Sequence, residues 1–298
     1  MTDRLPHRGQ GLGRVLGLPE DRATRHWLLA VLLVAVGLPI LLAAGLFVFR
    51  NEIVATAVAY IPVEQEKRLA DELWKVHRAR LKLIEGTAAN LFVETLGDRL
   101  AAARPTPYRY RIHIADDPAI NAFALPAGII VINRGLIENA ANAEEIAGVL
   151  AHEIEHVEHR DALRGMARAL GVTAVWIVLT GDAGSGMLGD WLRNLAELHF
   201  SREQEAEADE AGHARLLAAQ IDPRGLASFF KRLAEHRGDL PGVLALLSTH
   251  PPSEERAAKL DALLRAAPAF QPLEPNWKAI QDSLTQPPKP KDTQAGSG

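Results

Sequence analysis

A stretch of 23 uncharged, mostly apolar residues, Trp27 to Phe49, constrains this chain more than any other feature of its sequence. The hydrocarbon core of a bilayer is about 30 Å thick and takes about 20 such residues to cross as a helix. The stretch predicts a retained single-pass anchor at 27–49 after a flexible tail at 1–26. A cleaved signal peptide ending near Ala43-Ala44-Gly45 is the alternative, although its apolar region usually spans only about 7–15 residues.

Basic residues on the two sides of this stretch indicate its orientation. Five arginines precede it, whereas only Arg50, Lys67 and Arg68 follow it as far as residue 69. The side richer in Lys and Arg usually stays in the cytoplasm. We therefore expect a single-pass membrane protein whose larger part lies on the periplasmic or extracellular side.

The composition excludes several classes of protein. The formal net charge is −4 without a long run of one sign, so the basic stripe that nucleic acid requires is missing from the sequence. No cysteine is present, so any metal must be bound by histidines and carboxylates. The phosphate-binding pattern Gly-x-x-x-x-Gly-Lys-Ser/Thr is also missing, so no nucleotide partner is expected.

The chain after the anchor predicts an α+β fold that is mainly helical. Residues 50–106 form its helical first part, with two helices within 64–103 that are separated at Gly86. Alternating and short apolar runs then predict strands at 108–114, 121–125 and 129–132. Pro126-Ala127-Gly128 forms the turn between the last two strands. We expect these strands to form a small antiparallel sheet.

Helices are predicted for most of the remaining chain. They cover 143 to beyond 159, 192–219, a segment from Pro223, and a last segment capped by Ser253. The apolar run 170–180 is too short to span a bilayer, and it predicts a core helix or a segment that rests on the membrane. A Gly-rich loop follows at 181–189. Residues 267–298 are expected to be a tail, disordered from Gln286 onward.

The helix that should begin after Asn142 carries the pattern His-Glu-x-x-His as His152, Glu153 and His156. Asn142 is its expected N-cap, with Glu145 as the capping-box partner. Residues four apart on a helix differ by about 40° around its axis, so both imidazoles face one point. That arrangement suits a Zn²⁺ ion, with Glu153 able to act as general base toward a metal-bound water. A solvated helix face rich in His and Glu is the alternative.

A catalytic zinc keeps three protein ligands and one open position, so a third ligand is needed. A pattern with a third His would place it at position 162, which is Ala162. The acidic segment 200–209 offers carboxylates instead. Glu205 and Asp209 lie four residues apart on one helix face, so one can bind the metal while the other holds a ligand imidazole. An acidic, solvated helix is the alternative for this segment.

Four segments in order, from about residue 108 to 262, resemble a family of membrane zinc metallopeptidases. The family includes the CAAX prenyl protease, the HtpX-type proteases and bacterial envelope-protein proteases. The matching segments are a strand with Asn-Ala-Phe, the metal helix, a Ser-Arg-x-x-Glu-x-x-Ala-Asp segment and a His-Pro-Pro element, here 121–126, 144–157, 201–209 and 249–256. The resemblance implies a zincin-like domain at about 107–266 that binds one Zn²⁺.

The resemblance also implies individual roles. Glu205 becomes the third zinc ligand and Asp209 the partner of a ligand histidine. His250 lies near the zinc, where it either stabilises the oxyanion or fills the open position in a resting state, and Arg256 anchors the acidic cluster. The strand with Asn121, Ala122 and Phe123 holds substrate backbone by edge pairing. Arg160-Asp161 departs from the Arg-His of the family, and Pro126-Ala127-Gly128 departs from its Pro-Gly-Gly.

The sequence therefore predicts a membrane-anchored zinc metalloendopeptidase. Polypeptides are its expected partners, and the resemblance suggests ATP-independent quality control of membrane or envelope proteins. A non-proteolytic chaperone or scaffold with a structural zinc is the rival from another class. A structural site usually has four protein ligands, which His250 could complete, but such a site does not require Glu153 as a base.

Overall fold

A computed structural model of the chain describes residues 22–171, 200–235, 270–274 and 276–285, together with residues 175, 246, 249, 250, 256, 258, 259 and 262. Two compact units are present, Met1–Ile53 and Val54–Gly298. Several predicted features lie outside the described residues: most of the apolar run 170–180, the loop at 181–189, the Ser253 cap and the end of the tail from Gln286.

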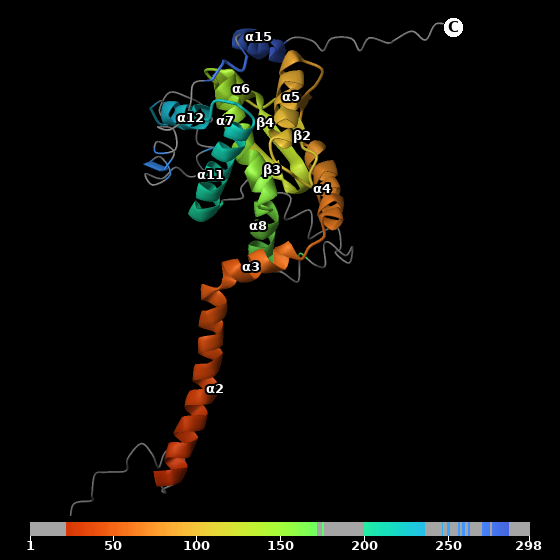
Figure 1. Ribbon diagram of the computed structural model, residues 1–298. Coiled ribbons are helices and arrows are strands. Elements are labelled where there is room, and N and C mark those ends of the chain that lie inside the picture. The colour runs from red at the N-terminus through yellow and green to blue at the C-terminus, as the bar shows by residue number, and fades with distance from the viewer. Residues whose placement is uncertain are drawn as a thin grey trace, which may run out of the picture. The chain divides into compact units, whose positions relative to one another are not determined.

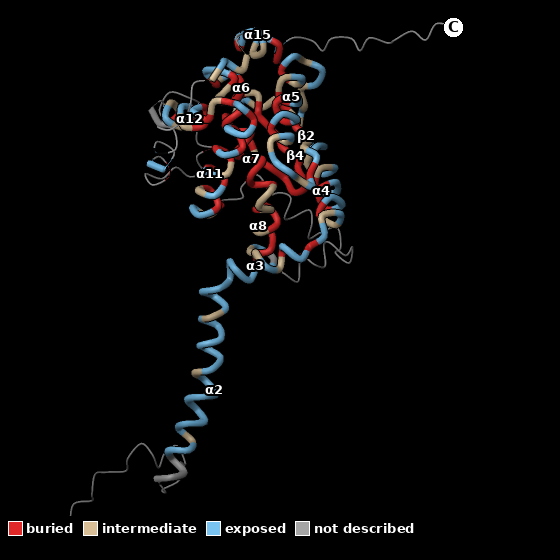
Figure 2. Tube along the Cα trace, in the orientation of Figure 1, coloured by how far each residue is buried: buried red, intermediate tan, exposed pale blue. Residues whose placement is uncertain are grey.

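The first unit contains α2, Arg22–Val48, as its described helix. Its segment His26–Val48 is long and apolar enough to cross a membrane. Most of its leucine and valine residues are exposed, and the tube of α2 in Figure 2 is mostly pale blue. Such a continuous apolar surface is unfavourable in water and is matched by lipid. A signal sequence has the same properties, so the retained anchor stays a prediction.

The elements that follow α2 are mostly helices (Figure 1). In chain order they are α3 Arg50–Ala59, α4 Val63–Arg78, β1 Leu83–Ile84, α5 Ala88–Ala102, β2 Arg111–Ala115, β3 Ala122–Leu125, η1 Pro126–Gly128, β4 Ile129–Asn133, α6 Arg134–Asn139, α7 Ala143–Glu158, α8 Asp161–Leu170, α11 Arg202–Ala218, α12 Arg224–Glu235, α15 Trp277–Asp282 and η3 Ser283–Thr285. The predicted mainly helical α+β fold is confirmed.

The described strands form one sheet with the order β1-β2-β4-β3. Strands β3 and β4 are antiparallel around η1, and β1 is antiparallel to β2. Strand β2, however, pairs with β4 in parallel, so the prediction of an antiparallel sheet is wrong at this pairing. After β2 the chain passes to the far edge for β3, and β4 then returns between them in the direction of β2. Alternation along a strand indicates burial but not the direction of its neighbours.

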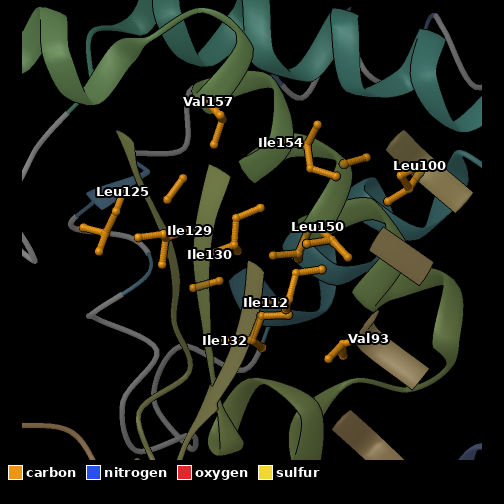
Figure 3. Close-up of a cluster of buried hydrophobic side chains, with 14 of the residues drawn as sticks. Val93, Leu100, Ile112, Leu125, Ile129, Ile130, Ile132, Leu150, Ile154 and Val157 are labelled. Atoms are coloured by element: carbon orange, nitrogen blue, oxygen red, sulfur yellow. The ribbon is translucent and has the colours of Figure 1, made fainter. Parts of the chain in front are cut away.

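Helix α7 lies at the centre of the second unit, between the sheet and helices α11 and α12 (Figure 1). Figure 3 shows its Leu150, Ile154 and Val157 in one buried cluster with Ile130 and Ile132 of β4. The crossing of α7 and α12 is unusually close, since a Cβ on Gly148 would lie 2.4 Å from the backbone nitrogen of Leu226. Because α7 is surrounded in this way, its polar face is buried as well.

The two ends of α7 were largely predictable. The Asn142 side chain accepts a hydrogen bond from the backbone N–H of Glu145, which confirms the N-cap. The expected capping box does not close, because the Glu145 carboxylate accepts from the N–H of Ala141 instead. The helix ends at Glu158, slightly earlier than predicted. Arg160 then adopts the left-handed conformation with φ 56°, which costs about 1–2 kcal/mol for a residue with a Cβ.

The segment predicted as a C-terminal tail is ordered where the structure describes it. The indole N–H of Trp277 donates to the carbonyl of Ala140 at 2.9 Å, and the Gln281 amide donates to the carbonyl of Ile137 at 3.0 Å. Ile137 lies within α6, and Ala140 directly follows this helix. Helix α15 therefore caps the end of α6, a contact that joins residues about 140 positions apart and has no local signal in the sequence.

Candidate metal centre

The predicted ligands come from two neighbouring helices and one segment near residue 250. His152 and His156 lie one turn apart on α7, and Glu205 lies in the first turns of α11. Ser201 and Gln204 close a capping box that fixes the start of α11. The helix N-terminus favours a carboxylate at this place. Together with His250, these side chains are buried and converge on one point.

The spacing of the donor atoms fits a tetrahedral metal ion. Nε2 of His152 lies 3.0 Å from Nε2 of His156 and 3.3 Å from Nδ1 of His250. Oε1 of Glu205 lies 2.9 Å from Nδ1 of His250 and 3.5 Å from Nε2 of His156. Ligands about 2.0–2.1 Å from a tetrahedral ion are about 3.3–3.4 Å from one another. The four donors therefore have the spacing that such an ion requires.

Each histidine of α7 is oriented by a carboxylate on its other ring nitrogen. Nδ1 of His152 lies 2.9 Å from Oδ1 of Asp209, and Nδ1 of His156 lies 2.8 Å from Oδ2 of Asp161. Ligand histidines of metalloproteins almost always have such a partner, which fixes the tautomer and the ring plane. Both Nε2 atoms therefore present a lone pair to the centre.

Arg256 connects Glu205 and Asp209, two of the carboxylates of α11. Its guanidinium binds Asp209 through Nε at 2.7 Å and Nη2 at 2.9 Å, and its Nη1 lies 2.6 Å from Oε2 of Glu205. Arginine suits this position because its planar fork matches a carboxylate with two bonds. Arg256 thus occupies one oxygen of Glu205 and leaves Oε1 directed at the histidines. The contact with both carboxylates is the geometry expected of an anchor for the acidic cluster.

The buried histidines and carboxylates of this cluster together favour a cation. Burial opposes a charge on His156, but its hydrogen bonds with Asp161 and Glu205 raise its pKa to about 10. Burial likewise opposes a charge on Glu205, yet His250 and His156 hold the pKa of Glu205 far below its usual range. The negative charge of the surrounding carboxylates therefore favours a proton on His156. A metal ion can replace that proton, because metal and proton compete for the same lone pairs.

Glu153 faces the same centre without a partner of its own. Its side chain is 1 % exposed, and among the described residues neither carboxylate oxygen accepts a hydrogen bond. Nε2 of His250 lies 3.3 Å from its Oε1. Burying an unpaired carboxylate is costly. Glu153 therefore indicates a place for a polar molecule beside the four donor atoms.

The strand predicted to bind substrate lies at an edge of the sheet. No described strand pairs with the outer side of β3, which contains Ala122 and Phe123. Asn121 directly precedes β3, and the Thr249 hydroxyl lies 3.4 Å from Oδ1 of Asn121. The segment that carries His250 is thus adjacent to the start of this edge strand. The geometry permits edge pairing, and substrate binding there remains a prediction.

Three residues of the centre were not predicted. Asp161 was noted only as a departure from a family pattern, yet it binds His156. Gln204 donates from Nε2 to Oδ1 of Asp161 at 2.5 Å. Phe200 stacks on the His156 ring with centroids 4.0 Å apart. A carboxylate directly after a metal helix was the available signal for Asp161, whereas Gln204 and Phe200 had none.

Fold and site together define a metallopeptidase of the His-Glu-x-x-His class. The chain belongs to peptidase family M48, whose sequence model matches residues 88–264.

Three relatives illustrate what the chain is similar to. The mitochondrial metalloendopeptidase OMA1 of Schizosaccharomyces pombe is 28 % identical over 70 % of this chain and 63 % of its own length. The beta-barrel assembly-enhancing protease of Yersinia pestis is 29 % identical over 72 % of this chain and 46 % of its own. The metalloprotease LoiP of Escherichia coli is 33 % identical over 51 % of this chain and 60 % of its own. The matches thus span about half to two thirds of these relatives.

Proposed function

We propose that the chain is a zinc-dependent metalloendopeptidase, anchored in a membrane by α2, that cleaves unfolded or surplus membrane and envelope proteins without ATP. His152, His156 and Glu205 would hold the zinc, Asp209 and Arg256 would orient these ligands, and Glu153 would be the catalytic base. Within family M48, the resemblance to HtpX-type and CAAX prenyl proteases gives a finer proposal. The relatives named as endopeptidases and assembly-enhancing proteases support the first of these proposals.

One observation carries the proposal: the buried Glu153 carboxylate has no hydrogen-bond partner among the described residues and lies 3.3 Å from His250, a member of the four-residue cluster that could hold a metal. A structural site has no need of such a group. A hydrolase needs a base that is held ready for the proton of a water molecule. The cost of burying Glu153 is therefore explained by catalysis.

The chemistry follows from the positions of the side chains. When bound, zinc supplies Lewis acidity to the scissile carbonyl and to a water molecule. Glu153 accepts the proton of the attacking water and passes it to the leaving amine. The outer edge of β3 holds the substrate backbone in an extended conformation. Once the imidazole of His250 has moved away from Glu205, it donates a hydrogen bond to the carbonyl oxygen of the scissile bond, which becomes negative in the transition state. Donors aimed at a developing charge stabilise the transition state.

A non-proteolytic chaperone with a structural zinc is the second candidate. The position of His250 favours it, because Nδ1 of His250 completes four donors around the centre, and structural zinc sites usually have four protein ligands. Under this proposal the metal centre would connect α7, α11 and the segment near residue 250. The chain would then bind unfolded polypeptides without cleaving them.

Digestion of casein by the purified full-length chain in detergent separates the two candidates. Wild type should degrade casein, and Glu153→Gln should abolish cleavage while one zinc per chain remains bound. Glu207→Gln is the matched control, because this exposed residue of α11 loses the same charge. Casein that stays intact with zinc-loaded wild type, at every time point and concentration, would favour the chaperone.

The side of the membrane on which the second unit lies is a separate proposal. The five arginines that precede Trp27 support a periplasmic or extracellular location for it. A C-terminal alkaline phosphatase fusion should be active, and a green fluorescent protein fusion exported this way should be dark. The opposite result would place the metal centre in the cytoplasm.

A further inference from the structure

Glu66 of α4 is a buried carboxylate outside the cluster of predicted metal ligands. It is 0 % exposed. Its Oε2 accepts from the hydroxyl of Tyr108 at 2.9 Å and from Nε of Arg160 at 2.9 Å, and its Oε1 accepts from the backbone N–H of Ala127 at 3.1 Å. A buried charge is tolerated only with partners of this kind. Glu66 therefore joins three separate segments: the approach to β2, the turn η1 and the junction of α7 and α8.

Arg160 extends these connections to the segment 58–61. Its Nη1 donates to the carbonyls of Val58 and Ile61, each at 2.9 Å. The side chains of both residues are buried. The segment 58–61 is thus bound to Arg160 through its backbone, not only through apolar contacts.

The backbone of Arg160 is strained in order to make these contacts. Its φ of 56° lies in the left-handed region, which disfavours a residue with a Cβ. Such an outlier persists when surrounding contacts hold it, and it is often found beside functional sites. The strained turn determines where the next residue, Asp161, directs its carboxylate. That carboxylate lies 2.8 Å from Nδ1 of His156.

The second end of the arrangement is the turn η1. Ala127 also has a left-handed φ of 55°, and it lies two residues beyond the end of β3. Its N–H is held by Glu66. The same carboxylate and guanidinium therefore fix the end of the edge strand β3 and the end of the metal helix α7.

We infer that Glu66 and Arg160 form a positioning unit that fixes the position of the edge strand β3 relative to the metal helix α7. The segment 54–61 belongs to this unit. The inference deepens the proposed function and rests on it, because β3 is the proposed place of the substrate backbone. Neither residue touches substrate or metal. Their effect is exerted through Ala127 and Asp161.

Three single variants of the full-length chain test the unit. Arg160→Lys keeps the charge but cannot bind Glu66 and two carbonyls at once. Arg160→Gly removes the backbone strain together with the guanidinium. Glu66→Gln keeps the shape and removes the charge. Arg232→Lys is the matched control, since Arg232 pairs with the buried Glu145 at the opposite end of α7.

Activity per zinc-loaded molecule is the first measurement. For each of the three variants we expect KM for an unfolded protein to rise about tenfold or more, because a displacement of about 1 Å far from the chemistry can cost up to 10²-fold. Zinc content should stay at one per chain, and the control should keep its KM. If Arg160→Gly matches wild type in KM, the guanidinium has no positioning role and the inference is overturned.

Hydrogen exchange is the second measurement, and it does not depend on catalysis. The amides of 122–133 should exchange at least about tenfold faster in the three variants than in wild type or in the Arg232→Lys control. The inference would be overturned if residues 122–133 of the three variants exchanged as in wild type while their melting temperatures fell as much as that of Arg232→Lys. That result would show that Glu66 and Arg160 form a purely structural ion pair. A chain that never cleaves casein but shows the faster exchange would refute the proposed function and keep the positioning unit.

Discussion

Nδ1 of His250 lies 2.9 Å from Oε1 of Glu205, and both side chains are almost completely buried. Its other ring nitrogen lies 3.3 Å from Oε1 of Glu153. The imidazole therefore stands between a predicted metal ligand and the predicted base. A catalytic zinc site keeps this fourth position open for water or substrate. The arrangement matches a resting state in which His250 must leave before the site can work.

Replacement of His250 should separate its two proposed roles. We expect His250→Ala to keep its zinc, because three ligands remain, and to lower turnover by about 10²–10³, as loss of one oxyanion donor does. Initial rates with excess casein and the zinc content would be measured, with His159→Ala as the control on the same side of the metal helix. Raised basal or self-cleavage would assign His250 to gating alone. Unchanged turnover and zinc affinity would contradict both roles.

Metal content should follow the predicted ligands. We expect one Zn²⁺ per chain, and strong loss of zinc in His152→Ala and in Glu205→Ala, because each removes one of three ligands. Elemental analysis after gel filtration gives the stoichiometry. Glu207→Gln, two residues beyond Glu205 and exposed, should retain the full amount. Full retention in both ligand variants would exclude this site.

Asp161 should contribute to metal binding without touching the metal. Its carboxylate orients His156 and is itself held by Gln204. Loss of such a partner typically costs about 10–100-fold in metal affinity or activity. We expect this loss for Asp161→Ala and a smaller one for Gln204→Ala, measured by competition with a chelator. Equal affinities in wild type and Asp161→Ala would refute the role, and Asp222→Ala at an exposed ion pair is the control.

Acid should destabilise the chain through His113, outside the metal centre. This side chain stacks on Trp74 with ring centroids 4.2 Å apart. Burial, with the nearby charges of Arg111 and Arg78, lowers the pKa of His113. A histidine pKa lowered by folding means that the unfolded chain binds more protons. Stability is therefore present above the unfolded pKa of about 6.5 and is lost as pH falls toward the folded pKa.

His113→Phe removes this titration and keeps an aromatic ring against Trp74. We expect the melting temperature of the zinc-saturated variant to fall less between pH 7 and pH 5.5 than that of wild type. His77, whose pKa burial also lowers, titrates in both proteins and serves as the internal reference. An identical fall in the two proteins would show that His113 does not contribute to acid sensitivity.

Local patterns in the sequence determined most of the helices and the content of the predicted centre. His152, Glu153 and His156 share a helix face because helical geometry depends only on their spacing. Asn142 caps that helix through a contact across three residues. The hairpin of β3 and β4 follows from two short apolar runs and a turn between them. Each of these features depends on neighbouring residues, whose patterns reveal it.

Only the tertiary structure decided the relationships between distant segments. Arg160 binds Glu66 across 94 positions of sequence, whereas only the family resemblance predicted that His250 lies near the metal, 3.3 Å from His152 across 98 positions. The parallel pairing of β2 with β4 and the hydrogen bond from the Trp277 indole to the carbonyl of Ala140 also join segments that are distant in the sequence. Such contacts form where packing brings the segments together, and no periodicity along the chain records which buried carboxylate will meet which cation. The sequence by itself therefore predicted the class of chemistry. The packing of distant segments decided which side chains orient the predicted ligands and how His250 comes to occupy the fourth position.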